Sequence, residues 1–157
     1  MMWSAFVMIF LSLGVLEGQK VTGQVAFHST VAKPDLTNLY PGMTVIFDNV
    51  ITNIGGSYNP MTGMFQAPLN GVYAFNVGAM SRPRHLEHLE LVKDAKRIQT
   101  LYADAGDIGS FASVSLNAVL ELNTGNMVWV RAAGGSNQIH GEDFTFFSGW
   151  LLFKKEN

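Results

Sequence analysis

The stretch that decides the fold runs from Phe47 to Phe75 and reads FDNVITNIGGSYNPMTGMFQAPLNGVYAF. Turn-forming residues interrupt it at Gly55-Gly56, Asn59-Pro60, Thr62-Gly63 and Pro68-Leu69-Asn70-Gly71. Glycine and asparagine tolerate positive φ angles, and proline presets the first φ angle of a turn. These turn-forming residues therefore predict short strands that are separated by tight turns.

The last part of this stretch, residues 71–77, alternates between two faces. Tyr73, Phe75 and Val77 share one face, and smaller or polar residues fall on the other. An alternation with period two is typical of a β-strand with one buried face. We therefore expect a half-buried strand that begins directly after a tight turn.

The spacing of these residues resembles the signature of the C1q globular domain. That signature consists of a Phe, an Asn or Asp, an aromatic residue, a second Phe, and then Gly-x-Tyr-x-Phe. The positions in register with it are Phe47, Asn53, Tyr58, Phe65, Gly71, Tyr73 and Phe75. One position departs from the pattern, because Val77 stands where the family usually has a further aromatic residue.

A second block near the C-terminus extends the resemblance. Residues 147–153, FSGWLLF, are similar to the Phe-Ser-Gly-aromatic-Leu ending of C1q domains, with Phe147 and Gly149 at the motif positions. Residues 125–130, GNMVWV, resemble the turn and penultimate strand of the family. The resemblance implies an all-β fold, a ten-stranded jelly-roll β-sandwich that assembles as a trimer. From the residues alone, another antiparallel sandwich is the alternative.

Length and composition indicate one globular domain. The chain has 157 residues, of which 48% are hydrophobic and only 14% charged, with 16 glycines and no cysteine. The absence of cysteine excludes disulfides and thiolate metal sites. The net charge of −2 argues against nucleic-acid binding, which needs a basic surface.

The sequence predicts a signal peptide over residues 1–18, a short linker over 19–24 and the globular domain over 25–157. Trp3 to Leu16 is almost continuously apolar and is shorter than the about 20 residues that span a bilayer. No Lys or Arg precedes this run, so a short uncleaved anchor and a first buried strand remain alternatives. The linker contains no collagen-like Gly-X-Y repeat, and we expect a stand-alone secreted head without a collagen stalk.

Several further strands follow from local periodicity. The expected strands cover residues 25–28, 43–50, 71–81, 86–93, 98–102, 111–122, 127–132 and 144–153. Residues 86–93 also fit one face of a helix, but the turn residues that follow favour a hairpin. Residues 134–143 are expected to form a polar loop.

The last expected strand, Phe144 to Phe153, is apolar on both faces. Phe144, Phe146, Trp150 and Leu152 fall on one face, and Phe147, Leu151 and Phe153 on the other. A strand with two apolar faces needs cover on both. One face is expected to meet the opposite sheet and the other a second copy of the subunit; a loop lying over that face is the alternative.

No catalytic pattern is present, and we expect no enzymatic activity. The four histidines are scattered, and His85 and His88, three apart on a strand, point to opposite faces. The nucleophile motif Gly-x-Ser-x-Gly and the glycine-rich phosphate loops are absent. No cofactor is required by any pattern in the sequence.

Two kinds of candidate site remain. Asp104 and Asp107 lie in a glycine-containing loop and are candidate calcium ligands, although the same spacing is common in ordinary turns. The resemblance favours calcium, since some C1q-type trimers bind it through acids of the corresponding loop. The candidate ligand-contacting residues of two other loops are Arg82, Arg84, His85, Asn137, Gln138 and His140.

The resemblance implies a function in recognition. We expect a secreted, lectin-like homotrimer that binds microbial surface carbohydrates, a pattern-recognition protein of innate immunity. The alternative is a trimeric signalling or scaffolding ligand for a protein receptor, as in C1q-like and tumour-necrosis-factor-like heads. A fold alone does not decide between these functions.

Overall fold

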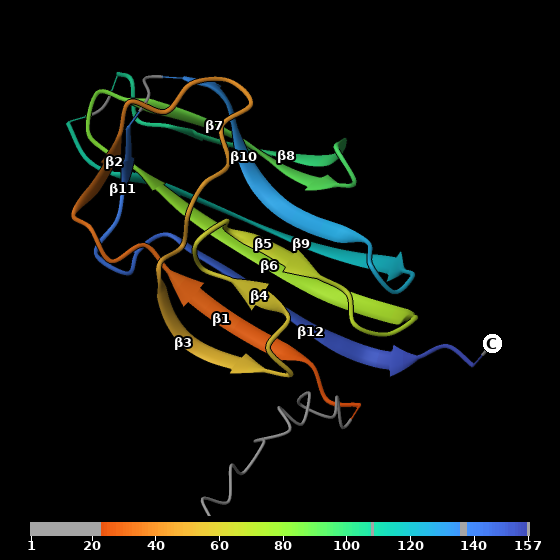
Figure 1. The fold of residues 1–157 in the computed structure, drawn as a ribbon. Helices are drawn as coiled ribbons and strands as arrows, with labels where there is room; N and C mark the ends of the chain where they lie inside the picture. The colour runs from red at the N-terminus through yellow and green to blue at the C-terminus, as the bar shows by residue number, and fades with distance from the viewer. Residues whose placement is uncertain (1–22, 108, 136–137, 157) are drawn as a thin grey trace, which may run out of the picture.

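Two antiparallel β-sheets, with no helix, account for the regular structure of residues 23–107, 109–135 and 138–156, which are the residues described by the computed structural model (Figure 1). The predicted signal peptide, and residues 19–22 of the predicted linker, lie outside the described residues. The two sheets confirm the all-β jelly-roll sandwich that the sequence predicted.

One sheet has seven strands and the other has five. The seven-stranded sheet consists of β1 (Ala26–Thr30), β2 (Asp35–Thr37), β3 (Asn49–Ile54), β6 (Gly71–Ser81), β9 (Ala112–Leu122), β11 (Gln138–His140) and β12 (Phe146–Lys154). The five-stranded sheet consists of β4 (Tyr58–Asn59), β5 (Met64–Gln66), β10 (Met127–Gly135), β7 (Leu86–Lys93) and β8 (Lys96–Asp104), in that order. Four of these strands have only two or three residues, so hydrogen-bonded segments outnumber the ten strands that the resemblance implied.

The strand β6 is central, because it pairs with β9 on one side and with β12 on the other (Figure 1). The order continues from β12 to β1 and then β3. Near its end β6 also pairs with the short strand β11, which in turn pairs with β2. This arrangement brings segments from both ends of the domain into one sheet.

An aromatic core lies between the sheets and explains the motif positions. Phe47, Tyr58, Phe65, Tyr73, Phe75 and Phe147 are each at most 2% exposed. Phe27 stacks on Tyr58 and meets Phe147 edge to face, both with ring centroids 4.8 Å apart. Burial raises the pKa of Tyr58 to about 12, and its hydroxyl donates to the carbonyl of Phe47.

The non-aromatic motif residues have equally specific positions. The side chain of Asn53 accepts from the amide of Tyr58 and donates to its carbonyl, which holds the turn between β3 and β4. A Cβ at Gly149 would lie 2.6 Å from the ring of Phe27, and one at Gly71 would lie 2.7 Å from Leu151. These two positions therefore have no room for a side chain.

The hairpin predicted from the strands at residues 86–93 and 98–102 is confirmed. Strands β7 and β8 pair in antiparallel register and are joined by Asp94 and Ala95, whose φ angles are 46° and 67°. Two positive φ angles in a two-residue loop match the right-handed twist of the strands. The helical alternative for residues 86–93 is thereby excluded.

Two predicted segments differ most from the structure, whereas the other expected strands differ by at most a few residues at their ends. The strand expected over residues 43–50 begins only at Asn49, because residues 42–45 hydrogen-bond to β10 in one sheet whereas β3 pairs with β1 in the other. The chain therefore crosses between the sheets within this segment. The loop expected over residues 134–143 contains β11, whose Ile139 is fully buried between β2 and β6.

Candidate functional site

The structure brings two of the predicted ligand-contacting residues together, at the end of β6. Arg82 follows β6 directly, and His140 ends β11, which pairs with the last residues of β6. Gln138 begins β11, and the predicted Asn137 lies outside the described residues. Arg84 is exposed, with a φ angle of 67°, and its backbone amide donates to the carbonyl of Ala105.

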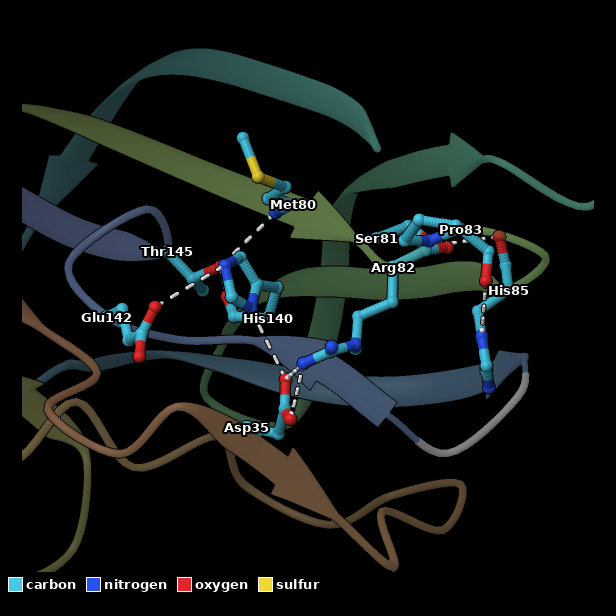
Figure 2. A network of polar contacts seen from close by, with 9 residues as sticks. All are labelled: Asp35, Met80, Ser81, Arg82, Pro83, His85, His140, Glu142 and Thr145. Atoms are coloured by element: carbon cyan, nitrogen blue, oxygen red, sulfur yellow. Dashed lines mark hydrogen bonds and ion pairs between the residues drawn. The ribbon is translucent and has the colours of Figure 1, made fainter. Parts of the chain in front are cut away.

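Asp35 is the centre of a polar network that joins Arg82 to His140 (Figure 2). The Nη1 atom of Arg82 lies 2.6 Å from both carboxylate oxygens of Asp35, and the Nδ1 atom of His140 lies 3.2 Å from Oδ1. The other ring nitrogen of His140 lies 3.9 Å from the carboxylate of Glu142. The hydrogen bond from Arg82 is the main reason that the pKa of Asp35 lies below its ordinary value.

Aromatic rings enclose the histidine of this network. The ring of His140 lies 4.8 Å from that of Phe111 and 5.2 Å from that of Phe144, measured between centroids. The guanidinium of Arg82 lies 6.0 Å from the ring centroid of Phe111. His140 is only 7% exposed, so its side chain is a packed part of the fold and not of a solvated loop.

The remaining predicted contact, His85, lies apart from the network. Its Nδ1 atom is 3.0 Å from the carbonyl of Pro83, and its own carbonyl accepts from the hydroxyl of Ser81 (Figure 2). These bonds define the turn between β6 and β7. The network and this turn together join β2, β6 and β11, and they contain no nucleophile placed against a base.

We expect Asp35→Asn to lower the free energy of unfolding at pH 7 by about 1 kcal/mol, because the substitution removes the negative charge that pairs with the partly exposed Arg82. The folded-state pKa of Asp35 is depressed, so its contribution is complete above about pH 5 and is lost as the pH falls below about 4. Urea unfolding at pH 7 and at a pH below about 4 measures the effect. The free energies of unfolding of the variant and of the natural protein should differ at pH 7 and become equal in acid. Glu121→Gln, which removes an exposed ion pair with Lys155, is the control and should change little.

The two candidate calcium ligands lie at the end of the β7–β8 hairpin. Asp104 is the last residue of β8, and its Oδ1 atom accepts from the amide of Gly106, as in an ordinary turn. Within the described ranges, no group of three or more His, Asp or Glu side chains has the geometry of a metal site. Two carboxylates are too few for the six to eight oxygens that calcium prefers. Backbone carbonyls, water or acids from neighbouring copies would have to complete the shell.

Calcium binding stays a prediction, and its test is thermal. If Asp104 and Asp107 bind calcium between copies, a chelator should lower the melting temperature at low ionic strength, where repulsion between carboxylates is least screened. Asp104→Asn combined with Asp107→Asn should remove that sensitivity. Identical melting curves with calcium and with chelator would assign this loop to an ordinary turn.

The outer face of the seven-stranded sheet carries an exposed row of apolar residues. The register aligns Trp150 of β12 with Ala74 of β6 and with Ala26 of β1. Ala74 in turn pairs with Val119 of β9, and Ala26 with Ile54 of β3. We call this row the apolar band; it consists of Val119, Ala74, Trp150, Ala26 and Ile54. Val119, Trp150 and Ile54 are 65%, 40% and 49% exposed, so no loop of the described chain covers them.

The two-faced character predicted for the last strand is confirmed, with two exceptions. Strand β12 begins only at Phe146, so Phe144 lies in the turn before it, where its amide donates to the carbonyl of Gly141. Phe147 is fully buried against the opposite sheet, whereas Trp150 and Leu152 lie on the outer face. Phe153 was expected to share the inner face with Phe147. It is 59% exposed instead, because a register shift between Leu151 and Phe153 changes the alternation.

These observations define the class of the protein as a jelly-roll β-sandwich domain with an aromatic core. The chain belongs to the C1q domain family, whose model matches residues 26–152. No segment of the described residues forms a helix that is long and apolar enough to span a membrane.

A relative and two solved structures give the comparison more detail. The chain is 34% identical over 134 residues to complement C1q tumor necrosis factor-related protein 3 of Mus musculus, and the match covers 83% of this chain. It covers 52% of that relative, so the chain spans about half the relative's length. The globular domain of zebrafish complement 1qA has a TM-score of 0.69 at 21% identity, covering 83% of this chain and 99% of that one. Eiger TNF from S. frugiperda has a TM-score of 0.67 at 15% identity, and the match covers 86% of this chain and 96% of that one. At these identities the two structures show the fold alone.

Proposed function

We propose that this chain is a secreted, non-enzymatic recognition protein whose C1q domain assembles as a homotrimer and binds carbohydrates of microbial surfaces in innate immunity. The observation that carries the proposal is the exposed apolar band on the seven-stranded sheet. Secretion is supported by the apolar run from Trp3 to Leu16.

The apolar band is suited to contact between copies of this chain. It crosses β9, β6, β12, β1 and β3, and Leu152 and Phe153 add exposed apolar surface on β12. Burying a large apolar side chain stabilises an assembly by about 1.5–3 kcal/mol. An apolar surface of this kind on a soluble domain marks an interaction site.

A polar row lies beside the apolar band and can fix how copies fit together. The register aligns Asn117, Asn76, Ser148 and His28 across four strands. The Nδ1 atom of His28 lies 2.6 Å from the hydroxyl of Ser148, whereas the Oδ1 atom of Asn76 is buried with no partner among the described residues. Copies that contact the band therefore also meet groups with fixed hydrogen-bonding requirements.

Assembly would present each loop several times. Weak contacts with a repeated surface ligand then gain strength, since the second and third contacts form within one complex. Microbial polysaccharides are repeated ligands of this kind. The net charge of −2 argues against nucleic acid as the partner.

The second candidate function is a trimeric ligand for a protein receptor. It is favoured by the 34% identity to a C1q tumor necrosis factor-related protein. Copies would assemble through the same apolar band in both functions. The two functions differ in the partner, which is a carbohydrate in the first and a protein receptor in the second.

Binding to a panel of immobilised bacterial and fungal polysaccharides separates the two functions. The proposal expects saturable binding of the purified protein to at least one polysaccharide, and inhibition by the same polysaccharide in solution. Capture of one membrane protein from animal cells, together with no binding to any polysaccharide, would replace recognition of carbohydrate by the receptor function.

A further inference from the structure

A hollow of about 550 Å³ opens on the five-stranded sheet, at the edge formed by β4 and β5. Its floor consists of side chains that point away from the core, including Met64 and Gln66 of β5 and Met127 of β10. Between Met64 and Gln66, Phe65 points inward and is fully buried. The rest of its lining comes from the turns beside these strands, including Gly55, Ser57, Thr62 and Gly125.

Tight turns form the walls of this hollow. Gly55, Gly56 and Gly125 have φ angles of 82°, 62° and 92°, which residues with side chains rarely adopt. The side chain of Asn59 accepts from the amide of Met61, and the amide of Gly63 donates to the carbonyl of Asn59. The walls are therefore held by local hydrogen bonds and are formed before any ligand binds.

The chemistry of the lining selects an uncharged ligand. None of the lining residues carries a charge, so an anionic or cationic ligand would meet no ionic partner. The Gln66 amide and the Ser57 and Thr62 hydroxyls supply both donors and acceptors. Met64 and Met127 add polarizable apolar surface beside them. A sugar ring has the matching properties, with hydroxyl groups at its edge and an apolar C–H face.

The floor of the hollow and the centre of the apolar band belong to different sheets. Trp150, at the centre of the band, is on the seven-stranded sheet, whereas Met64, Gln66 and Met127 are on the five-stranded sheet. The two features adjoin only at the turn where Gly55, which lines the hollow, follows Ile54 of the band. Contact between copies centred on Trp150 therefore leaves the floor of the hollow open. An assembly would carry one hollow per subunit, which is the arrangement that gains from repeated ligands.

We infer that this hollow is the glycan-binding site of the protein and that it accepts one or two residues of a neutral oligosaccharide. The inference rests on the proposed carbohydrate-binding function and names the site and the ligand class for it. It places the ligand on a different surface from the turn after β6 and the segment around β11, whose ligand contacts stay a prediction.

The test uses chitotriose, mannotriose and laminaritriose as neutral probes and sialyllactose as an anionic probe. Titration calorimetry measures affinity, and amide chemical shifts of the natural protein locate the bound sugar without any variant. We expect a neutral probe to bind and to shift the amides of Gly55, Gly56 and Gly125. Gln66→Glu, which places a carboxylate on the floor, should reduce its affinity at least ten-fold. Gln99→Glu changes an exposed glutamine of β8 in the same sheet and should leave the affinity unchanged.

The possible failures are distinguishable. Neutral sugar binding that shifts other amides and survives Gln66→Glu would overturn the site while leaving the proposed function intact. Tighter binding of sialyllactose than of the neutral probes would overturn the ligand class. If neither these probes nor any polysaccharide of the immobilised panel bound, both the inference and the proposed function would be wrong.

Discussion

Replacing Phe147 by alanine should lower the free energy of unfolding by about 3–5 kcal/mol, a large part of the stability of a domain of this size. Its ring lies 4.8 Å from that of Phe27, 5.7 Å from that of Phe47 and 6.0 Å from that of Phe75. Because the side chain is fully buried, its removal leaves a cavity that the surrounding rings cannot fill. Equilibrium unfolding in urea, followed by tryptophan fluorescence, measures the loss.

Tyr102→Ala is the matched control. It also removes an aromatic ring, but Tyr102 is 53% exposed on β8 of the other sheet. Its effect should stay below about 1 kcal/mol, as for most surface substitutions. A small loss for Phe147→Ala, equal to that of the control, would show that the aromatic cluster is not the core on which the fold depends.

Local sequence patterns predicted individual strands and turns, whereas the jelly-roll sandwich was implied by the resemblance to the C1q family. The alternation from Ala112 to Leu122 reappears as β9, with Leu116, Ala118 and Leu122 buried. The aromatic motif positions form one cluster between the sheets, and Gly71 and Gly149 lie where strands leave no space for a side chain. The alternation along β9 and the residue types at the motif positions can be recognised in the sequence without knowledge of which strands pair.

The errors arose where the neighbours of a segment decide its structure. Residues 43–50 have the composition of a strand, but the chain changes sheets there, and only pairing with β10 and then β1 reveals it. Strand β11 has three residues and is stabilised by β2 and β6 on its two sides. The outward position of Phe153 follows from a register shift that no alternation rule contains.

The candidate sites were predictable to a smaller extent for the same reason. Arg82 and His140 were singled out as separate loop residues, and the structure joins them through Asp35, which is 47 and 105 positions away from them in the sequence. Most residues that line the hollow beside β5 belong to the stretch from Phe47 to Phe75, whose pattern indicates strands and turns but no ligand. The walls of the hollow are turns and its floor contains methionines, and these were interpreted only as features of the fold.

Trp150→Glu should convert the assembled protein into monomers. The substitution places a carboxylate in the middle of the apolar band, between Ala74 and Ala26, at a position that assembly would bury in every copy. An unpaired buried charge costs several kcal/mol per chain, which exceeds the gain from burying one apolar side chain. Light scattering at micromolar concentration should give about three times the subunit mass for the natural protein and the subunit mass for the variant.

Binding to surfaces then separates the role of assembly from that of the site in each chain. Monomeric Trp150→Glu should retain the affinity of the natural protein for a soluble trisaccharide, because the hollow lies on the other sheet. Its apparent affinity for an immobilised polysaccharide should fall by about 100-fold or more, since multivalent binding is lost. Tyr102→Glu, an exposed aromatic changed in the same way on β8, should preserve both the mass and the surface binding. A natural protein that is already monomeric, or a variant that stays trimeric, would contradict the assembly through the apolar band.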